Sequence, residues 1–403
     1  MRRRFLFASA PLAGHLDWGG YLQTAAHLSR SGHEVIWVSE EQIRASVEAS
    51  GVTFQAVEVS GWRWPPARSE AEPADSAHIR FQRALDVTLS EDAVAQATQN
   101  LLDIARRFKP AAIIGEPLIG SAAIVAEQLD VPYAVCGYPA TPPEEHGFVE
   151  PEYAVAAQGE ARLKRLFEHF RVPGRNWPGG LSPWPQSPEL HVVYWTREWY
   201  ADEVNVRPQT QFVGGMAAPA NGNAPGWFDR IPPNVPLALI TLGSTFTDDP
   251  DFFVIAAQAS VRAGLFPIIA MGRSDRAPSL KQQLAPRLPR CIAVWWVDYD
   301  HLFPRLAVAI HHGGMGTTHA AVVHGVPQVI VPHAADQGLQ ARRAEASGVG
   351  LIVAPKDAAL ESMQRAIETV VRDPAFRIRA AKLSAAFARA GGVPRAAEWI
   401  GSL

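Results

Sequence analysis

Short apolar runs alternate with stretches of helical periodicity along the whole chain. In the first half the runs are Phe5 to Ser9, Glu34 to Ser39, Val52 to Val59, Ala111 to Gly115 and Pro132 to Gly137. Continuous apolar runs of this kind are typical of strands buried on both faces of a parallel sheet. Their alternation with helices predicts an α/β fold in which strand–helix–strand units make right-handed crossovers.

The second half repeats this pattern after a stretch rich in Gly, Pro, Asn and Ala at residues 213–236. Its predicted strands are Leu237 to Leu242, Phe266 to Gly272, Ile292 to Val297, Leu306 to Ile310, Gln328 to Val331 and Gly350 to Val353. A composition shift of this kind predicts an interdomain linker. We therefore expect one domain over residues 1–212 and a second over residues 237–385.

A glycine-rich turn, HHGGMGTT, joins the predicted strand that ends at Ile310 to a helical run that begins at His319. Glycines let a backbone approach a ligand closely, and the free N–H groups of a first helical turn attract anions. His312, Thr317 and Thr318 add side-chain donors. The turn therefore predicts a seat for a phosphate or diphosphate, although a plain capped turn is the alternative for such a segment by itself.

Two titratable residues follow predicted strands of the first half. His15 lies in the loop after the first strand, and Glu116 comes directly after Ala111 to Gly115. Ligands of parallel α/β sheets bind at the carboxyl ends of strands, so both residues are candidates for a site. From position alone, a packed or capping histidine and a capping or surface acid are the commoner roles.

Two tryptophans, Trp62 and Trp64, lie in a stretch rich in Pro and charge. This composition predicts a surface loop. The two rings are candidates to line an apolar substrate site, and anchoring of the loop is an equally good interpretation.

Composition narrows the classes of partner. The 403 residues have a formal net charge of −3, with 47% hydrophobic and 19% charged residues, which is ordinary for a soluble globular protein. This balance favours neither nucleic acid nor an anionic membrane as a partner. No segment approaches a membrane span, and we interpret the apolar run after the arginines at 2–4 as a strand, not a signal peptide. Because Cys136 and Cys291 are the only cysteines, we expect no disulfide framework and a cytoplasmic location.

Several of these segments together resemble one family. HHGGMGTT, GVPQVIVP and the pair Asp336-Gln337 resemble the donor-binding motif of the nucleotide-sugar-dependent inverting glycosyltransferases, which include bacterial natural-product and plant small-molecule enzymes. PLAGHLDWGGYLQTAAHLSRSGHEV resembles the opening of this superfamily, TLGST its second donor loop and WVDYDHLFPRL its nucleobase loop. The resemblance spans nearly the whole chain. It implies the GT-B fold, with two facing Rossmann-like domains, and a C-terminal helix at 386–403 that returns to the N-terminal, acceptor-binding domain.

The resemblance assigns catalytic roles in the first domain. His15 matches the family's general base, and Glu116 matches the acid that hydrogen-bonds the far nitrogen of that base. The chain departs from the family pattern in two places. The usual acid is Asp where this chain has Glu116, and a proline often stands a few residues after the histidine, where this chain has Asp17-Trp18-Gly19.

The resemblance also assigns the donor site. The matching residues are Ser244, Trp296, Val297, His312, Gly314, Gly316, Thr317, Asp336 and Gln337. In the family, Ser244, His312 and the glycine-turn amides meet the diphosphate, Trp296 stacks on the nucleobase, and Asp336-Gln337 hold the donor sugar.

The nucleobase loop departs from the family, because Asp298-Tyr299 replaces the usual Pro-Gln. With Asp300 these residues spell an acid-x-acid pattern, which we interpret as a chance pair of exposed acids and not as a metal site. We expect no metal or other cofactor, because a helix N-terminus can stabilise the leaving group without one.

Ala320 stands where many members have a glutamate that grips both ribose hydroxyls. Alanine cannot accept those bonds, which favours dTDP-sugars over UDP-sugars. The resemblance then implies transfer of the sugar to a hydroxyl of a lipophilic small molecule, with inversion, and allows a homodimer. The alternatives are a nucleotide-sugar epimerase of the same fold and a non-catalytic partner protein. A nicotinamide-dependent dehydrogenase is disfavoured, because no G-x-G-x-x-G follows the first strand.

Overall fold

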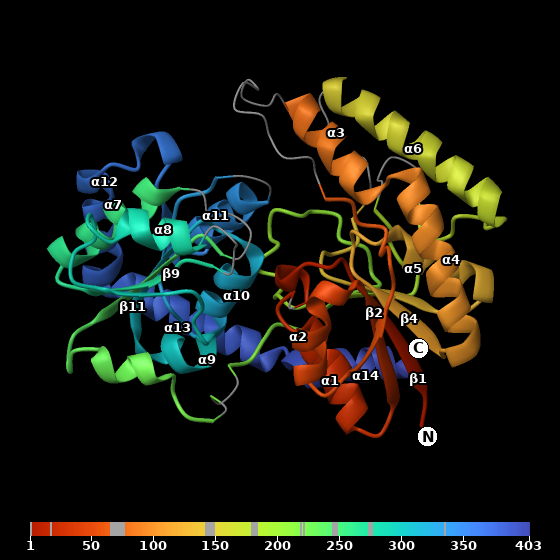
Figure 1. Ribbon diagram of the computed structural model, residues 1–403, viewed down its shortest axis with the longest axis horizontal. Helices are drawn as coiled ribbons and strands as arrows, with labels where there is room; N and C mark the ends of the chain where they lie inside the picture. Colours follow the sequence, from red (N-terminus) through yellow and green to blue (C-terminus); the bar gives the residue numbers. More distant parts are fainter. Residues whose placement is uncertain are drawn as a thin grey trace. The chain divides into compact units, whose positions relative to one another are not determined.

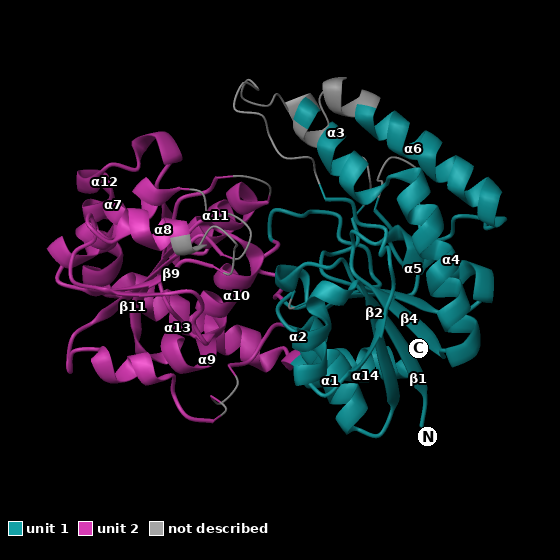
Figure 2. Ribbon diagram, viewed as in Figure 1, with its two compact units in different colours: residues 1–194, 201–213, 393–403 teal, residues 195–200, 214–392 magenta. Residues whose placement is uncertain are grey.

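The structure is a computed structural model that describes residues 2–16, 18–64, 77–141, 150–178, 184–217, 220, 222–243, 249–272, 277–333 and 336–403. The chain divides into two compact units, coloured in Figure 2. The first consists of residues 1–194, 201–213 and 393–403, and the second of residues 195–200 and 214–392. The chain therefore crosses between the units near residues 195–200, 213 and 393, and residues 214–236 of the predicted linker are part of the second unit.

The first unit is built on a parallel sheet of seven strands in the order β3-β2-β1-β4-β5-β6-β7. The strands are β1 (Arg4–Ala8), β2 (Glu34–Ser39), β3 (Thr53–Ala56), β4 (Ala112–Gly115), β5 (Tyr133–Cys136), β6 (Leu190–Val193) and β7 (Thr210–Phe212). Its helices are α1 (Tyr21–Arg30), α2 (Arg44–Ala49), α3 (Ala77–Thr88), α4 (Glu91–Phe108), α5 (Gly120–Leu129), α6 (Glu150–Phe170) and most of α14 (Gly392–Ser402).

Alternate residues of the central strand β1 face opposite helical layers. Leu6 joins a core with residues of α4, α5 and α6. Phe7 contacts Tyr21 of α1 on the other side, with ring centroids 5.5 Å apart. Both faces of the sheet are thus covered (Figure 1), which explains why these strands are apolar throughout.

The second unit is built on a parallel sheet of six strands in the order β10-β9-β8-β11-β12-β13. The strands are β8 (Leu237–Thr241), β9 (Phe266–Ala270), β10 (Ile292–Val294), β11 (Leu306–His311), β12 (Gln328–Ile330) and β13 (Gly350–Ile352). Its helices are α7 (Pro250–Arg262), α8 (Ala277–Leu284), α9 (Tyr299–Leu302), α10 (Met315–Val323), α11 (Gln337–Ala346), α12 (Leu360–Arg372) and α13 (Pro374–Arg389). Leu239 and Ile240, neighbours on β8, point into two separate cores on the two faces of this sheet.

The predicted α/β class and the two parallel sheets are confirmed. Three predicted boundaries are wrong. The third strand ends at Ala56, not Val59, and β10 ends at Val294, three residues early. The helix after the glycine-rich turn begins at Met315, not His319, because Gly, Thr and Thr are poor helix formers that concealed its first turn.

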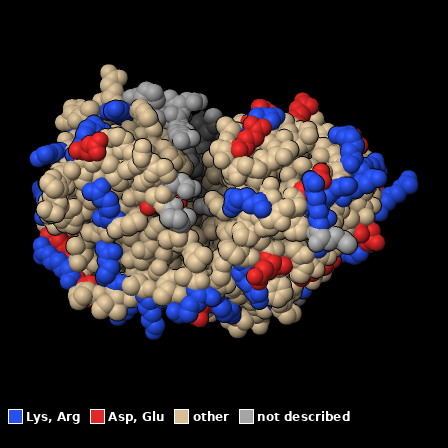
Figure 3. Space-filling model, turned by 90° about the horizontal axis from the view of Figure 1, so that it is seen from below, with Lys and Arg blue, Asp and Glu red and all other residues tan. Residues whose placement is uncertain are grey.

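The final helix α14 packs with the first unit. Ile400 is fully buried, and Arg3 donates to the carbonyl of Gly401 at 2.6 Å. None of the helices in the described ranges has the length and apolarity needed to cross a bilayer. On the face drawn in Figure 3, Lys and Arg are interspersed with Asp and Glu, in keeping with the small net charge of −3.

Candidate active site

The topology of the first sheet explains why His15 and Glu116 meet. β1 pairs with both β2 and β4, so the strand order reverses between β1 and β4, with Ala8 beside Gly115. Loops that leave two such neighbouring strands diverge and open a crevice at their carboxyl ends, where α/β proteins bind ligands. His15 lies in the loop after β1, at the end of a short 3-10 turn, Ala13–His15, and Glu116 directly follows β4.

His15 and Glu116 form a close pair. Nδ1 of His15 lies 2.8 Å from Oε2 of Glu116, whose side chain is completely buried while that of His15 is 23% exposed. A carboxylate against Nδ1 favours a proton on that nitrogen and leaves Nε2 free to take a proton from another group. The extra methylene of Glu relative to the family's usual Asp therefore does not prevent the contact.

The buried carboxylate has two further donors. The backbone N–H of Ala10 donates to Oε1, and the indole N–H of Trp18 donates to Oε2 at 2.9 Å. Burying a carboxylate is costly unless its oxygens are hydrogen-bonded, so these donors make an ionised acid tolerable at this position. Sequence reasoning identified Trp18 only as a departure from the family and did not find this contact.

Of the two tryptophans that are candidates for the acceptor site, one lies against His15. The rings of Trp62 and His15 are 5.7 Å apart in an edge-on arrangement, and the buried Nε1 of Trp62 has no hydrogen-bond partner among the described residues. Trp64 is 56% exposed. A role in binding an acceptor remains a prediction for both.

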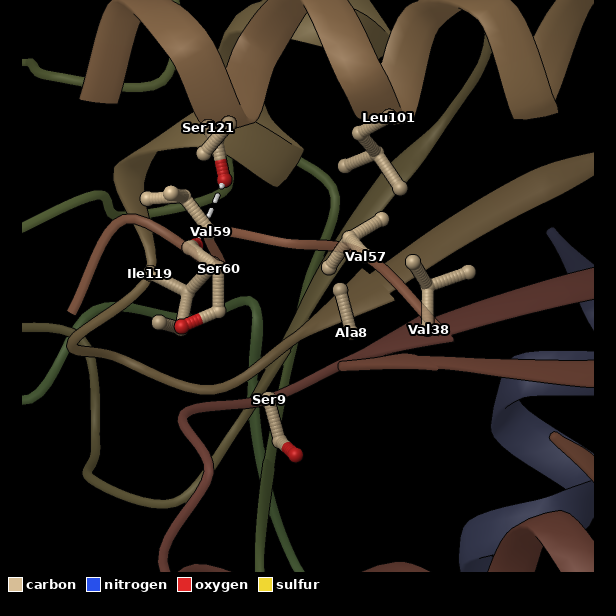
Figure 4. A pocket seen from close by; sticks show the side chains of 10 residues that line it. Ala8, Ser9, Val38, Val57, Val59, Ser60, Leu101, Ile119 and Ser121 are labelled. Carbon is tan, nitrogen blue, oxygen red and sulfur yellow. Dashed lines mark hydrogen bonds between the residues drawn. The ribbon is translucent and has the colours of Figure 1, made fainter. Parts of the chain in front are cut away.

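A small pocket lies beside the carboxyl end of β1 (Figure 4). Valine, leucine and isoleucine side chains form much of its wall, the hydroxyl of Ser9 points away from them, and Ser121 donates to the carbonyl of Ser60 at 3.3 Å. Its volume of about 10 Å³ is room for about one water molecule. This pocket is therefore too small for an acceptor and belongs to the packing of the sheet.

The second sheet has the same kind of reversal, between β8 and β11, where Thr241 pairs with His311. Two predicted donor loops leave these two strands. The first begins at Gly243, and Ser244 lies outside the described residues. The second is the glycine-rich turn, which leads into α10 with Gly314 as its N-cap.

The first turn of α10 has the backbone geometry that the predicted diphosphate seat requires. Its N-cap Gly314 supplies no side chain, and the N–H groups of Met315, Gly316 and Thr317 lack partners within the helix. The hydroxyl of Thr318, expected to face a ligand, instead donates to the carbonyl of Gly314 at 2.9 Å. Backbone amides at the positive end of a helix remain well placed to hold a phosphate.

The paired histidines before this helix have different roles. Nδ1 of His311 accepts from the N–H of Gly313 at 3.0 Å, and Nε2 lies 2.9 Å from Oε1 of Gln328. These two contacts fix a neutral imidazole, and burial lowers the pKa of His311 to about 4. His311 is thus a structural residue that shapes the turn.

His312 lies between the two donor loops. A Cβ at Gly243 would come within 2.8 Å of its Cε1, and one at Gly314 would overlap its Nε2, so both positions need glycine. Burial, and then the neighbouring His311 and His333, lower the pKa of His312 to about 3. Burial therefore favours the neutral imidazole of His312 at pH 7, which can meet a phosphate oxygen through an N–H donor.

His333 ties the loop after β12 to the start of α7. Its Nδ1 lies 2.7 Å from the carbonyl of Val331, and its Nε2 lies 3.2 Å from Oδ2 of Asp249. The hydrogen bond to His333 lowers the pKa of Asp249. No sequence motif signals this pair, because its members are far apart in the chain.

Asp336 and Gln337 lie at the start of α11, where Asp336 is the N-cap residue. Oε1 of Gln337 accepts from the backbone N–H of His333 at 2.8 Å, so this side chain already braces the loop. Contact of either residue with a sugar remains a prediction.

The nucleobase loop follows β10. Trp296 is 48% exposed and offers a ring face, whereas Val297 is buried. Asp298 and Tyr299, the two residues that depart from the family pattern, both make contacts within this unit. Asp298 caps α9 by accepting from the N–H groups of Asp300 and His301, and the hydroxyl of Tyr299 lies 2.9 Å from Oγ1 of Thr317 in the glycine-rich turn.

Residues 276–399 match the family described as erythromycin biosynthesis protein CIII-like, C-terminal domain. The chain is 22% identical over 431 residues to 4'-demethylrebeccamycin synthase of Lentzea aerocolonigenes, covering all of both proteins. The chain has the GT-B fold, and the proteins it resembles in sequence are named glycosyltransferases.

Other similarities agree. The chain is 24% identical over 442 residues to a sterol 3-beta-glucosyltransferase of Eremothecium gossypii; the match covers 99% of the chain but spans only about a third, 34%, of that relative's length. The solved glycotransferase of kitacinnamycin superposes with a TM-score of 0.78 at 21% identity, covering 99% of this chain and 98% of that one. A Streptomyces sp. SF2575 glycosyltransferase solved with thymidine diphosphate gives a TM-score of 0.69 at 20% identity, covering 100% of both chains.

Proposed function

We propose that this glycosyltransferase moves a sugar from a nucleoside-diphosphate sugar, with dTDP favoured over UDP, to a hydroxyl of a lipophilic small molecule, with inversion. The observation that carries the proposal is the His15–Glu116 pair. Its 2.8 Å contact leaves Nε2 of a partly exposed imidazole free to take a proton. A general base held by a buried acid is the arrangement that activates a hydroxyl as a nucleophile.

The proposed transfer needs only these residues, the acceptor and the nucleotide sugar. The acceptor oxygen would form a bond to the anomeric carbon while the bond from that carbon to the diphosphate oxygen breaks. The acceptor proton would go to Nε2 of His15, and Glu116 would stabilise the resulting imidazolium. The first-turn amides of α10 and neutral His312 would receive the negative charge of the leaving diphosphate, a role for which we propose no metal.

The preference for dTDP rests on Ala320, which lies in α10 and cannot accept hydrogen bonds from ribose hydroxyls. A 2′-deoxyribose lacks one of those hydroxyls. The structural relative solved with thymidine diphosphate supports the same donor class. A lipophilic acceptor is supported by Trp62, whose ring lies 5.7 Å from that of His15.

Calorimetric titration of the purified protein with dTDP, UDP and GDP tests the donor assignment. We expect dTDP to bind most tightly, and Gly314→Ala to weaken its binding. A protein that is folded but binds none of the three would overturn the donor site and favour a non-catalytic role. Equal or tighter binding of UDP would keep the diphosphate seat and overturn the argument from Ala320.

A further inference from the structure

Two departures from the family pattern, far apart in the sequence, meet in the first unit. One is Glu116 in place of the usual Asp, and the other is Trp18 after the loop histidine. The indole N–H of Trp18 donates to Oε2 of Glu116 at 2.9 Å. This is the same oxygen that faces Nδ1 of His15 at 2.8 Å.

The donors divide between the two carboxylate oxygens. Oε1 is held by the backbone N–H of Ala10, in the loop after β1. Oε2 accepts from the indole and lies 2.8 Å from Nδ1 of His15. A glutamate has one more rotatable bond than an aspartate, so a fixed position for its carboxylate needs a donor on each oxygen. Without the indole, only His15 itself would hold Oε2.

Trp18 is itself held firmly. It is 6% exposed, and its ring packs edge-on against Tyr138 with centroids 5.2 Å apart. The backbone of Trp18 has a φ of 39°, in the left-handed region that is unfavourable for a bulky residue. Such a conformation persists only where surrounding contacts enforce it, and it recurs at functional sites.

The indole also contacts the base. The rings of Trp18 and His15 are 5.2 Å apart and tilted by 57°. Trp18 thus restrains the imidazole through its ring and the carboxylate through its N–H. Together these contacts restrain the positions of both His15 and Glu116.

We propose that Trp18 is a positioning residue that acts on His15 through Glu116, and that the longer acid and the indole function as a matched pair. The proposal rests on the proposed function for its kinetic consequences, but its structural consequence can be measured without any substrate. Loss of the N–H leaves the negative charge on Oε2 to interact with the imidazole alone. The protonated imidazole is then favoured, so His15 titrates at higher pH.

The first experiment is NMR titration of protein labelled with ¹³C at histidine Cε1, with the His15 signal assigned from its loss in His15→Gln. In Trp18→Phe we expect the His15 midpoint to rise by roughly half a pH unit or more. The matched control is Trp37→Phe, which also removes a buried indole donor from this unit, the one that bonds Oγ of Ser9 at 3.0 Å. The control should leave the His15 midpoint unchanged. An unchanged midpoint in folded Trp18→Phe would overturn the proposal.

A second variant covers failure of Trp18→Phe to fold. Benzothienylalanine at position 18 keeps the fused ring and replaces only the N–H by sulfur. It should give the same upward shift of the His15 midpoint. Wild-type behaviour of this variant would equally contradict the role of the N–H.

Kinetics give an independent test once an acceptor is in hand. Trp18→Phe should lower kcat by roughly 10- to 100-fold, the usual scale for a partner that orients a reacting group, with little change in the KM for the sugar donor. In a Glu116→Gln background the same substitution should have little further effect, because Trp18 acts through Glu116. Additive losses would point to a merely structural tryptophan. A wild-type protein without transferase activity would instead refute the proposed function and leave the NMR comparison intact.

Discussion

At the scale of single residues, the chemistry depends on how buried polar groups are satisfied. Glu116 is fully buried and accepts from Ala10 and Trp18 while it faces His15. The roles of His15 and Glu116 followed from a family resemblance in the sequence. The role of Trp18 could not be predicted, because a contact over 98 positions of sequence depends on tertiary packing.

The carboxylate of Glu116 reaches these partners with the full length of its side chain. Glu116→Asp restores the family's usual acid but withdraws the carboxylate by one methylene. We expect the rate of sugar transfer to fall by about 10-fold or more, because the shorter acid cannot keep all of its partners.

The matched control is Glu127→Asp in the same unit. Glu127 is also buried and accepts from the backbone N–H groups of Gly174 and Asn176 at 2.8 Å and 2.7 Å. Its shortening should lower the free energy of unfolding without a selective loss of transfer rate. Full activity of Glu116→Asp would show that side-chain length is irrelevant here.

Ala320 gives a second prediction at this scale. Ala320→Glu introduces a carboxylate that can accept hydrogen bonds from ribose hydroxyls, which alanine cannot do. The dissociation constant for UDP should fall relative to that for dTDP by roughly 10-fold, the worth of a hydrogen bond to a charged group. Calorimetry on both nucleotides measures the ratio, and an unchanged ratio would contradict the ribose argument.

At the scale of elements, each sheet has one reversal of strand order, and the loops that leave the strands there carry candidate residues of that unit. Apolar runs located most strands correctly, because strands covered on both faces must be apolar. β6, Leu190–Val193, was not predicted, since its short run lies inside a segment rich in Pro and aromatic residues. The start of α10 was misplaced because its tertiary context overrides the low helix propensity of its first residues.

A single added methyl group, in Gly314→Ala, tests whether the turn before α10 holds the diphosphate. The φ of Gly314 is −63°, which any residue can adopt, so Gly314→Ala acts only through its Cβ, which would overlap His312. We expect the affinity for a nucleoside diphosphate to fall by roughly 10- to 100-fold, the cost of one hydrogen bond to a charged group. Titration calorimetry with dTDP measures this change.

Gly226→Ala serves as the control, since a Cβ there meets no atom within 4 Å. Its affinity for dTDP should equal that of the wild type. Tight binding by Gly314→Ala would mean that His312 does not contribute to the diphosphate seat.

At the scale of the whole molecule, three buried histidines make stability depend on pH. Burial lowers the pKa of His191 and His311 to about 4 and that of His312 to about 3. An unfolded histidine has a pKa of about 6.5. Between these values the unfolded chain binds more protons than the folded one, so these histidines stabilise the fold fully above about pH 6.5 and less as the pH falls.

Acidification from pH 7 to 5 should therefore lower the free energy of unfolding, with each histidine contributing up to about 1.4 kcal/mol per pH unit. Urea unfolding at several pH values gives the slope. This slope reports the number of protons taken up on unfolding. His312→Asn should lower that number by close to one, and His191→Asn should do the same for the first unit. An equal slope in wild type and both variants would contradict burial of neutral imidazoles.

The central claim is that His15 removes a proton from a hydroxyl during sugar transfer. Its most direct test is to incubate wild type and His15→Gln with dTDP- and UDP-sugars and a panel of lipophilic phenols and alcohols, and to measure the products by mass spectrometry. We expect the wild type to add one sugar to an acceptor. His15→Gln should still bind dTDP, but its rate of sugar transfer should be lower by about 10²- to 10⁴-fold. Transfer at the wild-type rate by His15→Gln would contradict the claim.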